Sequence, residues 1–349
     1  MSELLLPPPL PEPLPAERAI GLTTTVPVEV IFAARLVPVD LNNLFITDLD
    51  PLSLVTAAED AGFPRTCCCW TRGLYGVARR RGLSRVIAVT QGDCSNTGAL
   101  MEMLSFEGTQ CIPFGFPFEP DPARMADSIR SLAEALGTTV QEAERWRETL
   151  APARQKAAEI DRLTWQEGRV HGVENHLWLV STSDFCADPA RYDAEAARFL
   201  SAARRRRPFS HRLRLGFVGV PPIVPDIYAC IESAGGLVVY NETQRQFAMP
   251  EEADSLAEQY SLYTYPYGIF ARVEDVKREC ERRTLDGIIH YVQSFCFRRI
   301  EDRILRTSVP VPVLTVECDL PGALSGQLAT RLEAFVQMLE ARKAGRAIF

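Results

Sequence analysis

Three cysteines, Cys68, Cys94 and Cys296, lie where a predicted helix or strand gives way to a loop. The second and third each follow a strand-like run and precede a helix-like one. Ligands of α/β proteins collect at this end of the strands. Three thiolates meeting there would suit an iron–sulfur cluster in which the protein leaves one iron incompletely ligated. A cluster of that kind is a site of reaction, so these residues are candidate cofactor ligands.

The loop around Cys94 is the best single candidate. Residues 91–97 supply a glycine for a tight turn and Asp, Ser, Asn and Thr side chains for capping a helix. A helix that begins there directs amide groups and the positive end of its dipole at the sulfur. This is expected to lower the pKa of the thiol and to stabilise an anionic cluster. Cys296 repeats the arrangement after the strand-like run 288–292.

The other cysteines have a simpler interpretation. A free cysteine is often a small buried apolar residue. Five are assigned to packing: Cys111, Cys186, Cys230, Cys280 and Cys318. Cys67 and Cys69 flank Cys68 and are its neighbours or its alternates as ligand. Because the long separations between the candidate ligands match no short metal-binding motif, a cluster-free α/β protein whose cysteines only pack is the alternative.

Motifs for other chemistries are missing from the sequence. It holds no Gly-x-Gly-x-x-Gly after a strand and no phosphate loop ending in Gly-Lys-Ser/Thr, so the chain is not expected to hydrolyse ATP itself. It holds no Gly-x-Ser-x-Gly elbow either. The four histidines form no zinc pattern: His171, His176, His211 and His290. His290 lies in the strand leading to Cys296 and is interpreted as a core histidine or as a proton donor to substrate.

Charge and composition argue against several partners. The formal charge of -7 gives no reason to expect nucleic acid or an anionic membrane, and no apolar run approaches the ~20 residues of a membrane helix. The N-terminus lacks the basic start and long apolar stretch of a secretion signal. We therefore expect a cytoplasmic protein whose cysteines are thiols or metal ligands. The basic run 204–207 is either a solvated helix end or a binding strip for a phosphate-bearing ligand such as a coenzyme A tail.

The elements that must position these residues fall into four segments. Residues 1–20 form a Pro-rich arm that is expected to be extended and mobile. Residues 21–120 form a first α/β domain, residues 121–211 a mainly helical segment, and residues 212–349 a second α/β domain. Because strands alternate with helices, we expect two flavodoxin- or Rossmann-like parallel-sheet domains.

Short apolar runs and helical periodicity predict the individual elements. An apolar run at 26–32 opens the first domain. Strands are predicted at 85–90, 110–114, 214–220, 237–240, 287–292 and 313–316. Helices are predicted at 97–107, 121–136, 225–234, 273–283 and 327–341, with a further helix running through 146–160.

Five motifs then occur in a characteristic order between about residues 21 and 340. They are Pro27-Val28-Glu29 with Ala33-Ala34; Cys68-x-x-x-Arg72 with Gly76; Cys94 after a strand; Cys296 after Gly287-Ile288-Ile289; and Glu317-x-Asp319 followed by Gly326-Gln327-x-x-Thr330-Arg331-x-Glu333-Ala334-Phe335. Together they resemble the 2-hydroxyacyl-CoA dehydratase D-component family, which also contains benzoyl-CoA reductase subunits and double-cubane cluster proteins. The spacing to Arg72 selects Cys68 over its neighbours.

The resemblance implies a cofactor and a source of electrons. Cys68, Cys94 and Cys296 would hold a [4Fe–4S] cluster, or part of a double-cubane [8Fe–9S] cluster, in the cleft between the two α/β domains. A separate ATP-dependent activator would inject one low-potential electron. In the dehydratases of this family, the reduced cluster makes a ketyl radical from the acyl-CoA thioester, and hydroxide leaves the neighbouring carbon.

The resemblance also frames the possible functions. The first is radical dehydration or reduction of an acyl-CoA or related small molecule, by a homodimer or together with a paralogous subunit. The second is reduction of another small molecule by a double-cubane cluster. The third is a non-catalytic iron–sulfur scaffold subunit. In the enzyme readings, Ser95, Asn96 and Arg72 are the candidate polar groups near the open iron.

Overall fold

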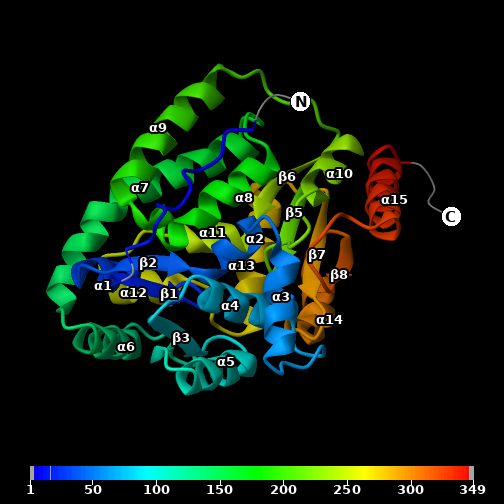
Figure 1. Ribbon diagram of the computed structural model, residues 1–349. Coiled ribbons are helices and arrows are strands. Elements are labelled where there is room, and N and C mark those ends of the chain that lie inside the picture. Colours follow the sequence, from blue (N-terminus) through cyan, green and yellow to red (C-terminus); the bar gives the residue numbers. More distant parts are fainter. Residues whose placement is uncertain (1–3, 16, 346–349) are drawn as a thin grey trace.

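The computed structural model describes residues 4–15 and 17–345, which contain two parallel sheets of four strands each (Figure 1). The first sheet has the order β2-β1-β3-β4 and the second the order β6-β5-β7-β8. The strands are β1 Ala19–Leu22, β2 Val37–Asp40, β3 Arg85–Gln91, β4 Gln110–Gly115, β5 Leu213–Gly219, β6 Gly236–Asn241, β7 Gly287–Gln293 and β8 Val313–Cys318. The predicted α/β class with two parallel sheets is confirmed.

The central strands are apolar because side chains pack on both of their faces. In β3, residues 86–89 are buried, and β7 is buried along its whole length. Ile87 of β3 pairs with Leu22 of β1 on one side and with Ile112 of β4 on the other. Continuous apolar runs of this kind are typical of parallel strands covered on both faces, which is why the sequence predicted these two strands well.

The helices of the first half are α1 Val28–Ala33, α2 Leu41–Thr47, α3 Pro51–Asp60, α4 Cys69–Arg80 and α5 Ser95–Phe106. α2 and α3 begin after Asp40 and Asp50, whose carboxylates accept hydrogen bonds from first-turn amides. α3 and α4 approach closely at Gly76, where an added Cβ would lie 2.2 Å from the Leu54 carbonyl oxygen. Because α4 begins directly after Cys68, this packing fixes where that thiol lies.

A helical middle segment follows, as predicted. It comprises α6 Pro122–Ala135, α7 Val140–Trp165, α8 Gly172–Val180, the short turns η1 Ser181–Ser183 and η2 Phe185–Ala187, and α9 Pro189–Arg205. Asp121 caps α6 and Pro122 occupies its first turn, within the predicted helix 121–136. The rings of Phe32 in α1 and Trp146 in α7 stack with centroids 5.0 Å apart. The middle segment is therefore packed directly on the first half.

The second half contains α10 Ile227–Ser233, α11 Glu242–Phe247, α12 Leu256–Leu262, α13 Ile269–Arg282, α14 Arg298–Ser308 and α15 Gly326–Lys343. One of its helices reaches back to the first half through Glu29, which is fully buried in α1. Tyr260 and Gln259 of α12 donate to the Glu29 carboxylate at 2.9 Å and 3.1 Å. Arg154 of α7 donates to the same carboxylate at 2.7 Å. Glu29 thus joins all three parts of the chain.

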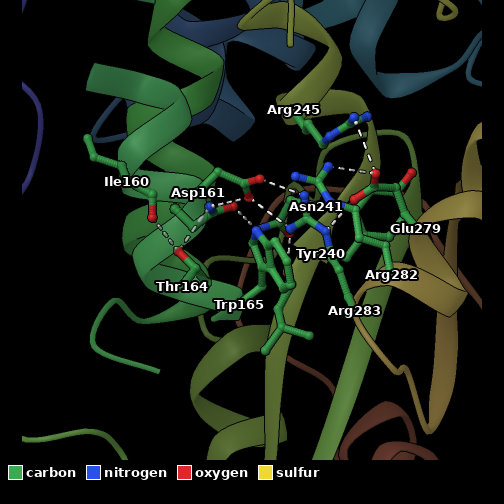
Figure 2. Close-up of polar contacts among 12 residues, drawn as sticks. Ile160, Asp161, Thr164, Trp165, Tyr240, Asn241, Arg245, Glu279, Arg282 and Arg283 are labelled. Atoms are coloured by element: carbon green, nitrogen blue, oxygen red, sulfur yellow. Dashed lines mark hydrogen bonds and ion pairs between the residues drawn. The ribbon is translucent and has the colours of Figure 1, made fainter. Parts of the chain in front are cut away.

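A buried ionic network ties the middle segment to the second half (Figure 2). Arg283, directly after α13, donates to Asp161 of α7 and to Glu279 of α13. Arg245 of α11 lies 3.4 Å from Glu279 and extends the network. Burying charges is costly unless each one is paired and hydrogen-bonded, and this network meets that condition for Asp161, Arg283 and Glu279.

The N-terminal arm contacts the middle segment. Residues 4–15 contain no helix or strand, and Leu5 anchors them to α8. The amide of Leu5 donates to Glu174 and the indole of Trp178 donates to the Leu5 carbonyl, both at 3.0 Å. β1 also begins at Ala19, slightly before the expected end of the arm.

No helix among the described residues is long and apolar enough to cross a membrane.

Candidate cofactor and substrate site

A cavity lies where both sheets reverse the direction of their crossovers. This reversal occurs between β1 and β3 in the first sheet and between β5 and β7 in the second. Ligand crevices of open α/β sheets lie outside the carboxyl ends of the strands at this switch point. The cavity has a volume of about 240 Å³ and is lined by Thr23 after β1, Cys94 after β3, Val220 after β5 and Cys296 after β7. Both halves of the chain therefore build one site.

Cys68, Cys94 and Cys296 all line this cavity. Cys68 is the N-cap residue of α4 and Cys94 is the N-cap residue of α5. Cys296 lies in the turn between β7 and α14, two residues before Arg298 opens the helix. The structure thus brings the three candidate ligands to the starts of three helices around one space. Their role as cluster ligands stays a prediction.

The pKa of Cys94 moves opposite to the direction predicted from the sequence. Burial raises it to about 12, and the negative charges of Asp93 and Cys68 raise it further. The backbone amides of Asn96 and Thr97 oppose this shift, as the helix N-terminus was expected to do. The prediction of a lowered pKa was wrong because the loss of hydration outweighs the amide hydrogen bonds.

Cys296 follows the same pattern. Burial raises its pKa, the amide and guanidinium of Arg298 lower it, and the charge of Cys68 raises it. A negative charge on Cys68 would raise the pKa of both other thiols, so the three sulfur atoms are near enough to influence one another. Bound metal ions invert this behaviour, since a coordinating thiol is deprotonated outright. A bound metal cofactor would therefore hold Cys94 and Cys296 as thiolates.

The donor set of the described residues does not form a site for a single metal ion. In residues 4–15 and 17–345, no three His, Cys, Asp or Glu side chains converge closely enough to hold one metal ion. A single ion such as zinc needs its sulfur ligands at about 2.3 Å. In an iron–sulfur cluster each cysteine binds a separate iron, so the sulfur atoms lie farther apart. Three thiols spread around a cavity are compatible with the second arrangement.

Unsatisfied polar atoms gather on the same cavity. Four buried side-chain atoms of lining residues have no hydrogen-bond partner within the described part of the chain: Asn43 Oδ1, Trp70 Nε1, Gln293 Oε1 and Arg298 Nη1. Leaving such an atom unpaired costs about 1–3 kcal/mol. Two of the four are donors and two are acceptors, and each of these atoms is itself almost without accessible surface.

Two of the three predicted polar residues line the cavity. Ser95 and Asn96 are in its wall at the start of α5. Arg72 is not among the lining residues. Its buried guanidinium donates from Nη1 to Glu59 at 2.5 Å, and its Nη2 lies 3.9 Å from Asp319. Arg72 therefore ties α4 to α3 and to the end of β8.

Other residues noted in the sequence take part in packing. His290 is buried and bonds to Asp302 at 2.7 Å, and burial lowers its pKa, so it is a neutral core histidine. In the basic run 204–207, Arg206 forms an ion pair with the buried Glu174 at 2.6 Å. This run ends α9, in agreement with the simpler interpretation.

The remaining cysteines divide by burial. Cys186 and Cys280 are buried among apolar side chains, as predicted. Cys69 is completely buried, whereas Cys67 is half-buried. Burial raises the pKa of Cys69 to about 12. Three cysteines that were assigned to packing are only partly buried: Cys111, Cys230 and Cys318. None of these seven residues lines the described cavity.

Arg298 is the most important lining residue that the sequence did not indicate. It is the only Lys or Arg among the described lining residues. It also lines a second cavity of about 350 Å³, together with Asp93 and Phe297. These three side chains form the wall that the two cavities share. Position alone could have suggested Arg298, because it follows Cys296 in the loop after a central strand.

The comparisons with known proteins agree with the arrangement of the fold. A family model described as 2-hydroxyglutaryl-CoA dehydratase, D-component, matches residues 23–339. This match spans both sheets and the middle segment. A search of curated proteins finds no match.

Proposed function

The chain belongs to the 2-hydroxyglutaryl-CoA dehydratase D-component family, and from this premise we propose that it is the iron–sulfur component of a dehydratase-type enzyme. It would use a low-potential electron for radical dehydration or reduction of an acyl-CoA or related small molecule. The observation that carries the proposal is the meeting of Cys68, Cys94 and Cys296 at one cavity on the switch points of both sheets.

The three cysteines are the proposed ligands of a [4Fe–4S] cluster or of part of a double-cubane cluster. Three protein thiolates leave one iron of a four-iron cluster without a protein ligand. When bound, the cluster would supply single electrons at low potential and an iron position open to the substrate. Burial and amide hydrogen bonds to sulfur are the protein's means of adjusting that potential, and both are present at Cys94.

The surrounding residues supply position and a dry environment. Asp93 fixes the loop by accepting hydrogen bonds from the Cys94 amide at 2.7 Å and from the Thr97 hydroxyl at 3.1 Å. Leu100 and Phe247 contribute apolar surface to the cavity wall. Excluding water from such a space strengthens every electrostatic interaction inside it. The chain's share of the chemistry is therefore binding, orientation and electrostatics.

We assign ATP hydrolysis to a separate activator protein, because the sequence holds no phosphate loop. The mouth of the site offers a surface for such a partner or for a second subunit. Four phenylalanines at the two cavities are exposed: Phe118 by 80%, Phe270 by 72%, Phe295 by 56% and Phe297, which lines both cavities, by 41%. Large exposed apolar side chains gathered at a site are typical of protein contacts, which supports docking at this face.

The decisive experiment is anaerobic purification with iron and sulfide quantitation, followed by electron paramagnetic resonance after low-potential reduction. Cys94→Ala is expected to lose the cluster signal. Cys230→Ala, a partly exposed cysteine of α10 outside the cavity, is the matched control and should keep it. An unchanged signal in Cys94→Ala would refute the ligand assignment, and the iron-to-protein ratio separates a four-iron cluster from a double cubane.

The substrate class is tested separately. A thermal-shift panel of acyl-CoA thioesters on the cluster-loaded protein should give stabilisation with at least one thioester, because a ligand that binds only the folded state raises the melting temperature. Absence of any shift would count against acyl-CoA and in favour of another small molecule or a scaffold role.

A further inference from the structure

Two buried carboxyl groups meet behind the wall of the cysteine-lined cavity, Asp40 at the end of β2 and Asp184 between η1 and η2. Asp184 Oδ2 accepts a hydrogen bond from the Asp40 amide at 2.8 Å. The Ser183 hydroxyl donates to Asp40 Oδ2 at 2.5 Å. Burial, followed by the charge of Asp40, raises the pKa of Asp184 to about 7, and burial also raises the pKa of Asp40. Neighbouring buried carboxylates seldom ionise together, so this pair is expected to hold one proton near neutral pH.

Asp184 also supports a strained turn. The next three residues, Phe185, Cys186 and Ala187, have φ values of 50°, 54° and 63°. This left-handed conformation is unfavourable for residues other than glycine, so the surrounding structure must hold it. Asp184 Oδ1 accepts the Cys186 amide at 2.8 Å, and the Phe185 ring packs at a right angle to the ring of Tyr192 in α9. Asp184 therefore binds the strained turn with one oxygen and the start of α2 with the other.

The helix that starts at this pair, α2, forms part of the cavity wall. Asp40 Oδ1 accepts hydrogen bonds from the backbone and side-chain amides of Asn42, both at 2.8 Å. Asn42 also donates to the Thr23 carbonyl oxygen at 2.9 Å, and Asn43 donates to the Ser183 hydroxyl at 3.2 Å. Thr23, Asn42 and Asn43 all line the cavity. A continuous set of hydrogen bonds therefore runs from the two carboxyl groups to the cavity.

The charged groups packed around the pair do not neutralise it. Arg154 of α7 lies 5.2 Å from the Phe185 ring, but it is paired with Glu29 at 2.7 Å. Cys186 and Tyr192 are neutral, because burial raises the pKa of each, and the nearby Arg191 only opposes this shift at Cys186. Within the described part of the chain, no Lys, Arg or His side chain is hydrogen-bonded to either carboxyl group.

We propose that Asp40 and Asp184 form a pH-sensitive clamp on the cavity: with one shared proton they hold α2 in place, and without that proton they loosen it. When the proton leaves for water, two buried negative charges repel each other and draw in solvent. The wall residues Asn42 and Asn43 then lose their fixed positions. The clamp holds below about pH 7 and is released as the pH rises above that value. It requires only the cavity, so it goes beyond the proposed function.

Trp70 can report on the position of α2. It lines the cavity, and its ring meets the ring of Phe45 in α2 edge to face at 5.4 Å. The full chain is labelled with 5-fluorotryptophan under anaerobic conditions, and fluorine NMR spectra are recorded between pH 5 and pH 8. The internal reference is Trp165, which packs on Arg282 at 5.0 Å. We expect the Trp70 signal, assigned with Trp70→Phe, to shift with a midpoint near pH 7 while the Trp165 signal stays constant.

Three variants locate the proton. Asp184→Asn should abolish the pH-dependent shift of the Trp70 signal, because asparagine has no proton to lose in this range. Asp254→Asn is the matched control at an exposed position and should keep the shift. Asp40→Asn should move the midpoint to lower pH, because the negative charge of Asp40 contributes to the raised pKa of Asp184.

Each outcome decides a separate point. A Trp70 signal that is constant with pH, or that shifts equally in wild type and Asp184→Asn, would overturn the clamp. If Asp184→Asn does not fold, an unchanged midpoint in Asp40→Asn would overturn it instead. Iron content, measured on every sample, tests the cluster independently: iron-free protein refutes the proposed function, whereas the Trp70 signal still decides the role of the carboxyl pair.

Discussion

Asp161 in α7 and Arg283 after α13 form a two-point ion pair, with Oδ1 to Nη1 at 2.9 Å and Oδ2 to Nη2 at 2.5 Å (Figure 2). The guanidinium of Arg283 is fully buried. Burial alone would raise the pKa of Asp161, but the charge and hydrogen bonds of Arg283 hold it below its usual value. This pair connects segments 122 residues apart, so it reports on the contact between the middle segment and the second half.

Removing one partner of this pair should destabilise the protein strongly. Asp161→Ala leaves Arg283 buried with Glu279 as its remaining carboxylate partner. We therefore expect the free energy of unfolding, measured by urea denaturation, to fall by about 3–5 kcal/mol. Asp127→Ala is the control, because its partner Arg130 and Asp127 itself are both exposed and such pairs contribute about 0–1 kcal/mol. Equal losses in the two variants would show that the buried pair does not hold these parts together.

Two helical glycines should respond in opposite directions to alanine. At Gly76 the new Cβ would lie 2.2 Å from the backbone oxygen of Leu54, so Gly76→Ala should force α3 and α4 apart and cost about 1–3 kcal/mol or more. At Gly98 in α5 a Cβ meets nothing within 4 Å. Gly98→Ala should therefore stabilise the protein by about 0.5–1 kcal/mol. Thermal unfolding measures both, and a stabilising Gly76→Ala would contradict the close approach of the helices.

The three consecutive cysteines should differ in their effect on iron content. Cys68 lines the cavity, whereas Cys67 and Cys69 do not. Cys68→Ser should lose the cluster, and Cys67→Ser should retain it, as judged by iron and sulfide analysis of anaerobic samples. Retention in Cys68→Ser with loss in Cys67→Ser would move the ligand to the neighbouring position.

Asp184 should make stability depend on pH. Burial, followed by the negative charge of Asp40, raises the pKa of Asp184 to about 7, whereas an unfolded chain has a value of about 3.9. The folded state therefore holds a proton that the unfolded state releases. The resulting stabilisation is complete below about pH 4 and is lost as the pH rises through about 7.

Urea unfolding at pH 5 and pH 8 measures this effect. Wild type should lose more stability between the two values than Asp184→Asn, because asparagine does not titrate. The amides of Asp40 and Cys186 donate to Oδ2 and Oδ1 of Asp184 at 2.8 Å, so the variant keeps one of these two hydrogen bonds and its lower stability is the same at both pH values. Asp254→Asn, an exposed position, should keep the wild-type difference. Identical pH dependence in wild type and Asp184→Asn would exclude a raised pKa at this carboxyl.

The parts of the fold that could be predicted are those with a strong local signal. β3 and β7 carry continuous apolar runs, and α6 carries an aspartate cap followed by proline. β1 was missed because its four residues follow the Pro-rich arm without a turn signal. The apolar run 26–32, for which the sequence predicted neither a helix nor a strand, leads into helix α1. Its contacts with α7 and α12 are tertiary and cannot be read from local composition.

The residues of the candidate site could be predicted less completely than the helices and strands. Cys94 and Cys296 follow from the pattern of strand, loop and helix, whereas Cys68 depended on the family motif because no strand directly precedes α4. Arg298 was missed because its burial between Tyr265 and Phe297 is a product of tertiary packing. The predicted direction of the Cys94 pKa shift was wrong for the same reason. The sequence identifies the neighbouring residues, but the loss of hydration on burial depends on tertiary packing.

The two halves of the chain contribute unequally to the thiol triad. Cys68 and Cys94 follow elements of the first half, whereas Cys296 belongs to the second. If one sheet rotated as a rigid body against the other, the distance between the sulfurs of Cys68 and Cys94 would stay the same. Only the distances from these two sulfurs to the sulfur of Cys296 would change. Such a rotation would therefore change the position of one ligand, and the hydrogen bonds from Tyr260 and Gln259 to Glu29, which join the two halves, would resist it.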